Sequence, residues 1–259
     1  MIAQAFYDET ADRKRTLRDG DGVRNVHNFI KACLIEEWVP HRAHLLDLGC
    51  GQGGDLRKFA RRQLRSYVGI DVSHASLQAH RRRMAEVPAF RCRTSLQCMD
   101  FCTARWARAE AYDAVSVQFA LQYAFASEAA ARGVLAQAAA SLRPGGVLLG
   151  TIPVHAAAAA FEQIMITLPG DLLDRACIEY NAPRDALVGL AAAEGLHLVL
   201  WSSFDAYYAA KRDERPGLAA RMRALGDPLP DNAVFVFEKK PAHARCARAN
   251  LACSSEALP

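Results

Sequence analysis

The stretch Leu45 to Phe59, LLDLGCGQGGDLRKF, constrains the fold more than any other part of the chain. Apolar residues around Asp47 indicate a short buried strand, four closely spaced glycines indicate a tight turn, and Asp55 to Arg62 is predicted to be a helix. Glycine is needed where the backbone adopts positive φ or touches a ligand, and amide groups at the start of a helix favour an electron-rich ligand group. The stretch therefore predicts a strand, a glycine loop and a helix at a binding site.

A second apolar segment, SYVGID, ends at Asp71, twenty residues after Gly51. A carboxylate in this place can accept hydrogen bonds from both hydroxyls of a ribose. The spacing GxGxG differs from the GxGxxG of dinucleotide-binding domains, and no GK[ST] follows, which argues against a P-loop. The pattern resembles the S-adenosylmethionine (SAM) site of class I methyltransferases.

Composition sets wider limits. The chain has 259 residues, of which 51% are hydrophobic, and this is ample for the core of one large α/β domain. A net charge of +4 permits an anionic substrate without requiring one. The eight cysteines form no CxxC and no zinc-like spacing with histidine, so we expect reduced thiols and no metal. No leader and no membrane-spanning apolar stretch is recognisable, so we expect a soluble protein with no membrane contact.

The remaining segments alternate between helix and strand. Helices are predicted at 23–39, 73–86, 127–142 and 155–166 and in the segment before Gly195; strands are predicted near 90–98, 113–117, 147–152, 196–204 and 233–240. Alternation of this kind predicts a Rossmann-like α/β fold, with a mostly parallel seven-stranded sheet flanked by helices and an antiparallel pair at its edge. We expect one domain over residues 1–240, with a polar N-terminal arm over 1–23 and a disordered tail over 241–259.

Four segments resemble those of messenger RNA cap guanine-N7 methyltransferases of eukaryotes and large viruses: RNVHNFIKACLI, LDLGCGQGGDLRKF, VSVQFALQYAFASE and LRPGGVLLGTIP. A fifth, IEYNAPRDALVGLAAAEGLHLV, matches that family in spacing. The resemblance runs from about Phe6 to Lys240. It implies transfer of a methyl group from SAM to N7 of the guanosine of a GpppN cap, with S-adenosylhomocysteine as product. It also implies a nuclear location, or a cytoplasmic viral factory if the source is a large DNA virus.

The resemblance places eight residues at the cofactor: Lys31, Gly49, Asp55, Asp71, Asp100, Phe101, Gln118 and Tyr123. Lys31 is then expected at the methionine carboxylate and Asp55 at the methionine ammonium. Asp71 would hold the ribose, and Asp100 would accept from the adenine amino group. Tyr123, with Gln118, would line the passage to the methyl group.

On the cap side the resemblance implies another eight residues: His27, Asn28, Gln52, Lys58, Arg83, Gln122, Glu179 and Asn232. One carboxylate, Glu179, can accept from the ring N–H and the exocyclic amine of guanine together, which would select guanine over adenine. Lys58 and Arg83 would neutralise the triphosphate bridge.

Several of these positions depart from the family pattern. Gln52 replaces a lysine, Gln122 a histidine, His27 an asparagine and Asn232 a tyrosine, while Val154 replaces an acid. Gln122 can still donate to the guanine carbonyl oxygen. Weaker cap binding or a different acceptor is therefore an open alternative.

The implied chemistry is a direct in-line transfer. The attacking lone pair of N7 carries no proton, so no general base or nucleophilic side chain is required. Orientation by Tyr123 and Glu179 is what the protein would supply. His27, His74 and His80 are then expected to be surface or contact residues without a catalytic role.

Two other functions stay open: a SAM methyltransferase with another acceptor, and a catalytically silent SAM-fold subunit that binds RNA or stimulates a capping partner. The first would share the glycine loop, Asp71 and Asp100 but would not need Glu179 or Lys58. We expect a monomer that works on capped RNA alongside other capping enzymes or a stimulatory subunit.

Overall fold

The computed structural model of the protein describes residues 8, 22–166, 177–228 and 231–240. Seven strands form one sheet in the order β3-β2-β1-β4-β5-β9-β8. They are β1 (His44–Leu48), β2 (Ser66–Asp71), β3 (Arg93–Cys98), β4 (Tyr112–Gln118), β5 (Leu142–Pro153), β8 (Leu196–Ser203) and β9 (Asn232–Lys239). The first five run parallel, and β9 runs antiparallel to both β5 and β8. The predicted mostly parallel, seven-stranded α/β fold is confirmed.

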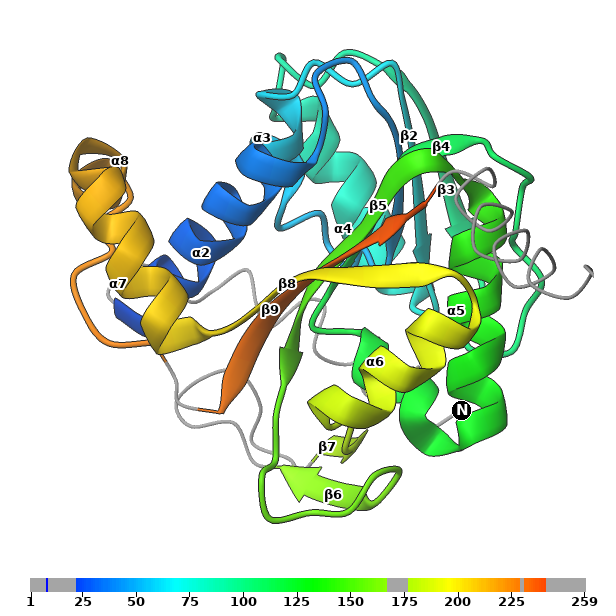
Figure 1. Cartoon of the computed structure of the whole chain (residues 1–259). Helices are drawn as coiled ribbons and strands as arrows, with labels where there is room; N and C mark the ends of the chain where they lie inside the picture. Colours follow the sequence, from blue (N-terminus) through cyan, green and yellow to red (C-terminus); the bar gives the residue numbers. More distant parts are fainter. Residues whose placement is uncertain (1–7, 9–21, 167–176, 229–230, 241–259) are drawn as a thin grey trace, which may run out of the picture.

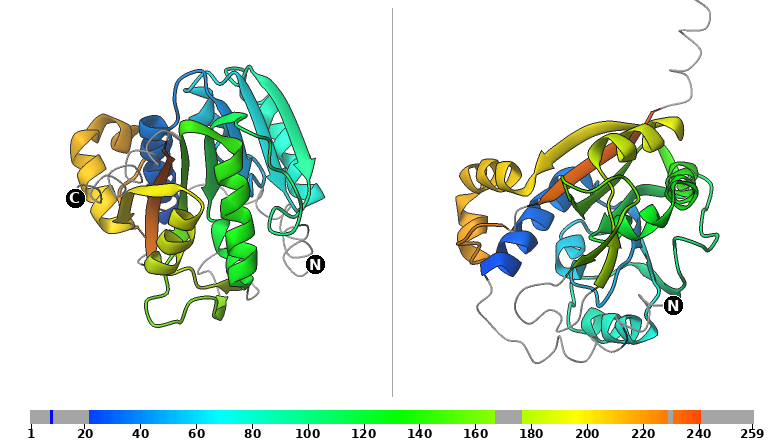
Figure 2. Two further views of the ribbon diagram at one scale, coloured as in Figure 1. Left: turned by 45° about the vertical axis from the view of Figure 1, so that its right-hand side comes forward. Right: turned by 90° about the horizontal axis from the view of Figure 1, so that it is seen from below.

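Helices cover both faces of the sheet (Figure 1). One face, which carries Leu45 and Leu149, packs against α2 (Gly22–Trp38), α7 (Phe204–Glu214) and α8 (Pro216–Arg221). The other, which carries Leu46 and Leu148, packs against α5 (Glu128–Ser141) and α6 (Arg184–Ala193). Figure 2 shows α5 and α6 together on this side in a turned view. Successive strand residues point to opposite faces, so nearly continuous apolar strands fill both cores.

Strand β1 lies between β2 and β4, where the order of the strands reverses. The helix α3 (Leu56–Ala60) follows β1, and α4 (His74–Ala85) follows β2. Ser73 caps α4 by accepting a hydrogen bond from the amide of Ser76 at 3.0 Å, as its sequence position predicts. Ligands of open α/β sheets bind at the carboxyl ends of the strands at such a reversal. The fold therefore places the glycine loop where a ligand is expected.

The predicted helix over 155–166 is wrong. Residues 163–166 form β6 (Gln163–Ile166), which pairs with β7 (Cys177–Tyr180) in a separate two-stranded antiparallel sheet. The amide nitrogen of Asn181 donates to the carbonyl oxygen atoms of His155, Ala158 and Ala159 at 3.1, 2.6 and 3.2 Å. Asn181 thus takes acceptors that helical hydrogen bonds would need, and tertiary contacts override the helix propensity of the alanines.

Other differences are smaller. The strand at residues 177–180 was not predicted, whereas the predicted helix that ends before Gly195 is confirmed as α6. The RPGG segment lies inside β5, with a register shift opposite Tyr112, rather than ahead of it. The helices α7 and α8 separate the last two strands and were not predicted. In the described ranges, no helix is both long and apolar enough to cross a bilayer.

The expectations for the two ends of the chain concern mostly residues outside the described ranges. The tail over 241–259 lies wholly outside them. In the predicted arm, Asp8 is described before Gly22, and its Oδ1 accepts from the Ser73 hydroxyl at 2.6 Å and from the Ala75 amide at 3.3 Å. This arm residue therefore contacts the first turn of α4.

Candidate functional site

The glycine loop is held tightly against β2. The amides of Gly49 and Cys50 donate to the carbonyl oxygen of Ile70 at 2.8 and 3.0 Å. Gly49 has φ +67°, and a Cβ atom there would lie 2.4 Å from the Cβ atom of Ala120, next to the end of β4. Only glycine fits such a position, which combines positive φ with close approach of two chain segments. The loop is thereby wedged between the carboxyl ends of the strands.

Asp71 links this loop to the start of α4. Its Oδ2 accepts from the Gly51 amide at 2.7 Å and its Oδ1 from the Ser73 amide at 2.9 Å. The side chain is buried, with 8% of its surface exposed. Each carboxylate oxygen can accept more than one hydrogen bond, so the carboxylate keeps the capacity to accept from a ligand hydroxyl.

Asp55 lies at the centre of a buried charge cluster between α2 and α3. Its Oδ1 is 2.9 Å from Lys31 Nζ and 2.7 Å from Lys58 Nζ. Burial opposes the charged carboxylate, but the two lysines together outweigh it and hold the pKa of Asp55 well below its usual range. Burial lowers the pKa of Lys58, against the opposing attraction of Asp55. The cluster ties α2 to the helix that follows the glycine loop.

This arrangement leaves Lys58 little capacity for a phosphate. Its Nζ also donates to Asn28 Oδ1 at 2.9 Å and to the carbonyl oxygen of Gly54 at 3.2 Å, and the residue is 8% exposed. An ammonium group has three N–H donors, and Asp55, Asn28 and Gly54 match that number. The predicted contact of Lys58 with the triphosphate therefore requires one of these bonds to exchange.

His80 is a buried contact residue, which is one of the two alternatives expected for it. Its side chain is 0% exposed, and Nδ1 lies 3.1 Å from the carbonyl oxygen of Gly51. Burial lowers the pKa of His80, which favours the neutral ring. His80 thus supports the glycine loop from behind.

Asp47 lies beneath the loop in β1 and is 5% exposed. Its Oδ2 accepts from the hydroxyl of Tyr67 at 2.8 Å. Burial, reinforced by the negative charge of Asp55, raises the pKa of Asp47 from 3.8 to about 7. A carboxyl group with this pKa changes its charge near neutral pH.

This shift predicts a pH dependence of stability. Between pH 3.8 and about 7 the folded state holds a proton that the unfolded state has released, so stability is greatest below this window and falls as pH rises through it. The full loss is on the order of 4 kcal/mol. In urea titrations between pH 4.5 and 8, the free energy of unfolding of Asp47→Asn should fall less steeply than that of the wild type. Parallel curves would contradict the shifted pKa.

At the end of β4 the chain turns sharply into a short 3-10 helix, η1 (Leu121–Ala126). Phe119, between them, has φ +53°, which is uncommon for a bulky residue. Its ring stacks on that of His27 at 5.7 Å between centroids, and the His27 ring meets Phe204 edge-on at 5.0 Å. The amide of Gln118 donates to the Ser116 hydroxyl at 3.2 Å and accepts from the hydroxyl of Thr151 at 3.2 Å. This turn directs η1 toward β7.

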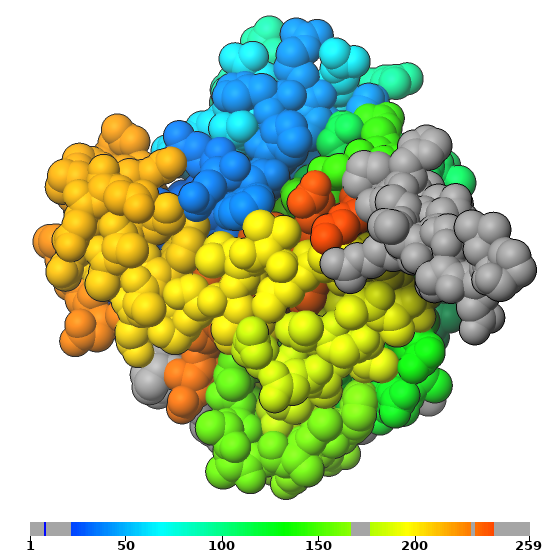
Figure 3. Space-filling view, viewed as in Figure 1, coloured from blue at the N-terminus to red at the C-terminus, as the bar shows by residue number. Residues whose placement is uncertain are grey.

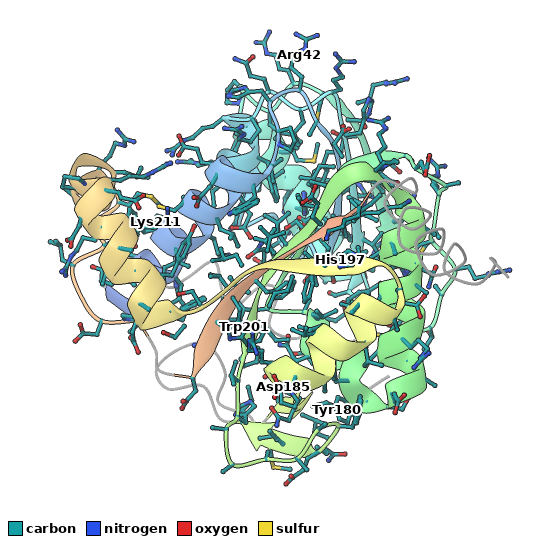
Figure 4. All side chains as sticks on the ribbon, viewed as in Figure 1. Arg42, Tyr180, Asp185, His197, Trp201 and Lys211 are labelled. Carbon is teal, nitrogen blue, oxygen red and sulfur yellow. The ribbon has the colours of Figure 1, made fainter. Side chains whose placement is uncertain are left out.

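Glu179 on β7 faces η1. Its Oε1 accepts from Gln122 Nε2 at 3.1 Å and from the hydroxyl of Tyr123 at 3.5 Å, whereas Oε2 is buried and has no hydrogen-bond partner. Glu179 is 7% exposed, and burial raises the pKa of its carboxyl group. Figure 4 shows Tyr180, the last residue of β7, at the opposite end of the molecule from Arg42. Arg42 precedes β1 and so marks the amino ends of the parallel strands. Strand β7 therefore lies toward their carboxyl ends. A buried carboxylate with one unpartnered oxygen is suited to a ligand that offers N–H groups.

The remaining predicted residues lie on separate elements. Asp100 and Phe101 follow β3; Asp100 is exposed and accepts from the Cys102 amide at 2.9 Å, while Phe101 is buried beside the glycine loop. A Cβ atom on Gly49 would lie 3.8 Å from the Phe101 ring. Gln52 belongs to the glycine loop, Asn232 begins β9, and Arg83 is exposed in the last turn of α4. The structure therefore gathers Gln122, Tyr123 and Glu179 into one cluster, and gathers Asn28, Lys31, Asp55 and Lys58 into another.

One residue of the first cluster was missed. The buried Cys177 lies two residues before Glu179 on β7, with Sγ 3.6 Å from the hydroxyl of Tyr123. Side chains two apart on a strand share a face, so a predicted strand at 177–180 would have revealed it. In the described ranges, no group of three or more His, Cys, Asp or Glu residues could hold a metal ion.

Comparison with known sequences places these features in a family. Residues 2–163 match the mRNA (guanine-N(7))-methyltransferase domain, which covers more than half of the chain and ends before β7. The chain is 37% identical over 165 residues to the mRNA cap guanine-N(7) methyltransferase of Saccharomyces cerevisiae, an alignment that covers 59% of this chain and 38% of that protein. It is 36% identical over 146 residues to mRNA cap guanine-N(7) methyltransferase 1 of Oryza sativa subsp. japonica, covering 51% and 38%. The chain thus spans about two fifths of the length of these curated relatives.

Comparison with solved structures shows the fold. The [4+2]-cyclase SpnF has a TM-score of 0.63 at 18% identity and covers 92% of this chain and 96% of its own. The CcbJ methyltransferase from Streptomyces caelestis has a TM-score of 0.60 at 15% identity and covers 91% and 98%. These similarities establish a Rossmann-like class I fold, and the sequence match is more specific. The chain belongs to the mRNA (guanine-N(7))-methyltransferase domain family.

Proposed function

We propose that the protein transfers the methyl group of SAM to N7 of the cap guanosine of GpppRNA. The observation that carries this proposal is Glu179, a buried carboxylate with one unpartnered oxygen, next to the turn at the end of β4. Guanine presents a ring N–H and an exocyclic amine side by side, and a carboxylate can accept from both. Adenine presents an acceptor at the corresponding ring nitrogen, so the same carboxylate would repel it.

The residues around the glycine loop fit SAM. Gly49 provides a close backbone approach, Asp71 is a buried acceptor for the ribose at the end of β2, and Lys31 brings a positive charge for the methionine carboxylate. Asp55 orients Lys31 through their 2.9 Å ion pair. The Asp55 carboxylate would contact the methionine ammonium in addition to this ion pair. Asp100 and Phe101 follow the neighbouring strand, on the side proposed for adenine. The proposed cofactor site therefore follows the carboxyl ends of β1, β2 and β3, with Gln118 and Tyr123 beyond β4.

The proposed mechanism relies on orientation. When bound, SAM supplies an electrophilic methyl group. Glu179 would grip the guanine edge opposite N7 and so direct N7 away from β7, while the Tyr123 ring would stabilise positive charge that develops on the purine. No side chain has to take up a proton, because the attacking nitrogen carries none. Alignment of this kind contributes up to roughly 7–11 kcal/mol in favourable systems.

Entry of the acceptor requires some movement. The Glu179 Oε2 atom is enclosed, and in the space-filling view the segment around β6 lies directly beside α6 (Figure 3). A cap would reach the carboxylate after residues that cover it move aside.

We further propose that residues 1–240 form one catalytic domain. This domain acts as a monomer in the nucleus, on capped RNA supplied by separate capping enzymes.

A transfer assay tests the proposed function. Purified protein is incubated with SAM labelled in the methyl group and with GpppRNA, GTP or uncapped RNA, and the label is traced to 7-methylguanosine after nuclease digestion. Label in 7-methylguanosine from GpppRNA is the expected result. Label in another nucleoside or in a small molecule would indicate a different acceptor. SAM binding without any transfer would indicate a catalytically silent subunit.

A further inference from the structure

The side chains of Gln122 and Glu179 have an uneven balance of hydrogen-bonding groups. Gln122 Nε2 donates to the carbonyl oxygen of Phe119 at 3.1 Å and to Glu179 Oε1 at 3.1 Å, which uses both N–H hydrogens of the amide. Gln122 is 1% exposed, and its Oε1 is enclosed with no hydrogen-bond partner, as is Glu179 Oε2. The two unpartnered atoms of this pair of side chains are therefore both acceptors.

The neighbours of Gln122 determine which way its amide points. With nitrogen and oxygen exchanged, Oε1 would face the carbonyl oxygen of Phe119 and the carboxylate of Glu179, which are both acceptors. Such an arrangement would replace two hydrogen bonds by two repulsive contacts. The oxygen of the amide is therefore the atom presented to a ligand. A hydrogen bond from Gln122 to the guanine carbonyl oxygen, the alternative expectation, would require one of these two bonds to exchange.

We infer that Gln122 is a specificity-determining residue whose side-chain oxygen accepts a hydrogen bond from the exocyclic amine of the cap guanine. The inference rests on the proposed function and deepens it. The edge of guanine opposite N7 carries three hydrogens, one on the ring nitrogen and two on the amine. Glu179 accepts the ring hydrogen and one amine hydrogen, and Gln122 Oε1 accepts the other. The two side chains would thus supply an acceptor for every hydrogen on this edge.

Hypoxanthine, the base of inosine, isolates this contact. It keeps the ring N–H, the carbonyl oxygen and N7 of guanine but lacks the amine. An inosine cap would leave the buried Gln122 Oε1 unpaired, and an unpaired buried acceptor is costly. Wild-type protein should therefore bind GpppA more tightly than IpppA, in which adenosine is the other nucleoside of both caps, and part of this preference should depend on Gln122.

The test compares the two cap dinucleotides by calorimetry on the full chain saturated with S-adenosylhomocysteine. Gln122→Met keeps length and volume but removes the acceptor, and Gln122→Leu is a second variant with the same loss. The exposed Gln78→Met on α4 is the matched control. We expect the ratio of GpppA to IpppA affinity to fall about 5- to 10-fold in the Gln122 variants, as for the loss of one neutral hydrogen bond. Affinity for IpppA should fall less than affinity for GpppA, because Gln122 also donates to Glu179, and Gln78→Met should keep the wild-type ratio.

The outcomes separate this inference from the proposed function. An unchanged ratio in the Gln122 variants would overturn the inference; if both caps lose affinity equally, Gln122 acts through Glu179 or contacts a group that both caps share, such as the carbonyl oxygen. Amine-dependent discrimination without methyl transfer would support the inference while refuting the proposed activity. Failure of the wild type to bind either cap would overturn both. Affinity for S-adenosylhomocysteine reports whether each variant is folded.

Discussion

Replacing Glu179 by alanine is expected to lower methyl transfer to GpppRNA by roughly 10²- to 10⁴-fold while leaving the affinity for SAM within about two-fold of the wild type. Two charge-assisted hydrogen bonds to guanine would be lost, and a loss of this size lowers kcat/KM by roughly 10²- to 10⁴-fold. The cofactor residues would stay in place, because the contacts of Glu179 are with η1 and not with the glycine loop. Transfer assays and calorimetry with SAM measure the two effects separately.

Two further variants make the Glu179 experiment sharper. Glu179→Gln keeps the shape but turns an N–H donor group toward a purine edge that itself carries donors, so it should be nearly as inactive as alanine. Glu128→Ala removes a carboxylate that is 62% exposed on α5 and should behave as wild type. A Glu179→Ala protein that no longer binds SAM would contradict the assigned role, as would one that still methylates caps at the wild-type rate.

The charge state of Glu179 adds a pH signature. Burial raises the pKa of this carboxyl group, and the proposed contacts require the ionised form. Cap affinity should therefore decline on acidification at a higher pH than for an exposed glutamate. If the cap affinity of the wild type does not decline on acidification in this way, contact between Glu179 and the cap is contradicted.

Where local pattern and packing agreed, the fold was predictable from the sequence. The glycine loop, the strand that ends at Asp71 and the Ser73 cap of α4 follow from residue types whose conformational preferences match the structure. The segment 155–166 was mispredicted because its preference for helix comes from alanines, while the structure is decided by Asn181, a residue far along the chain. A single sequence does not contain that contact in any local pattern.

In the candidate site, too, local features were predictable from the sequence and tertiary contacts were not. The resemblance named Gln122, Tyr123 and Glu179, and the structure brings these three side chains together from η1 and β7. The direction of the Gln122 amide was not predictable, because it depends on the carbonyl oxygen of Phe119 in an unusual backbone conformation. Nor did sequence show that Asp55 and Lys58 are partners, since each was assigned to a different ligand.

Replacing Asp55 by alanine is expected to cost about 3–5 kcal/mol of unfolding free energy, because it leaves two largely buried lysines without their counter-charge. The exposed ion pair of Arg184 and Asp185 is the matched control, and Asp185→Ala should cost less than about 1 kcal/mol. Urea denaturation of the two variants and the wild type gives both values. If Asp55→Ala loses as little unfolding free energy as the control, water must solvate the two lysines well enough to replace their counter-charge.

A combined variant separates stability from binding at this cluster. Replacing Lys31 and Lys58 by methionine together with Asp55 by leucine exchanges a buried charge cluster for apolar side chains, which is often neutral or stabilising. We expect this variant to recover most of the stability lost in Asp55→Ala but not to recover SAM affinity, because the positive charge proposed for the methionine carboxylate is gone. Recovery of both would mean that the cluster only joins α2 to α3. Recovery of stability alone would show that the cluster contributes to cofactor binding as well as joining the two helices.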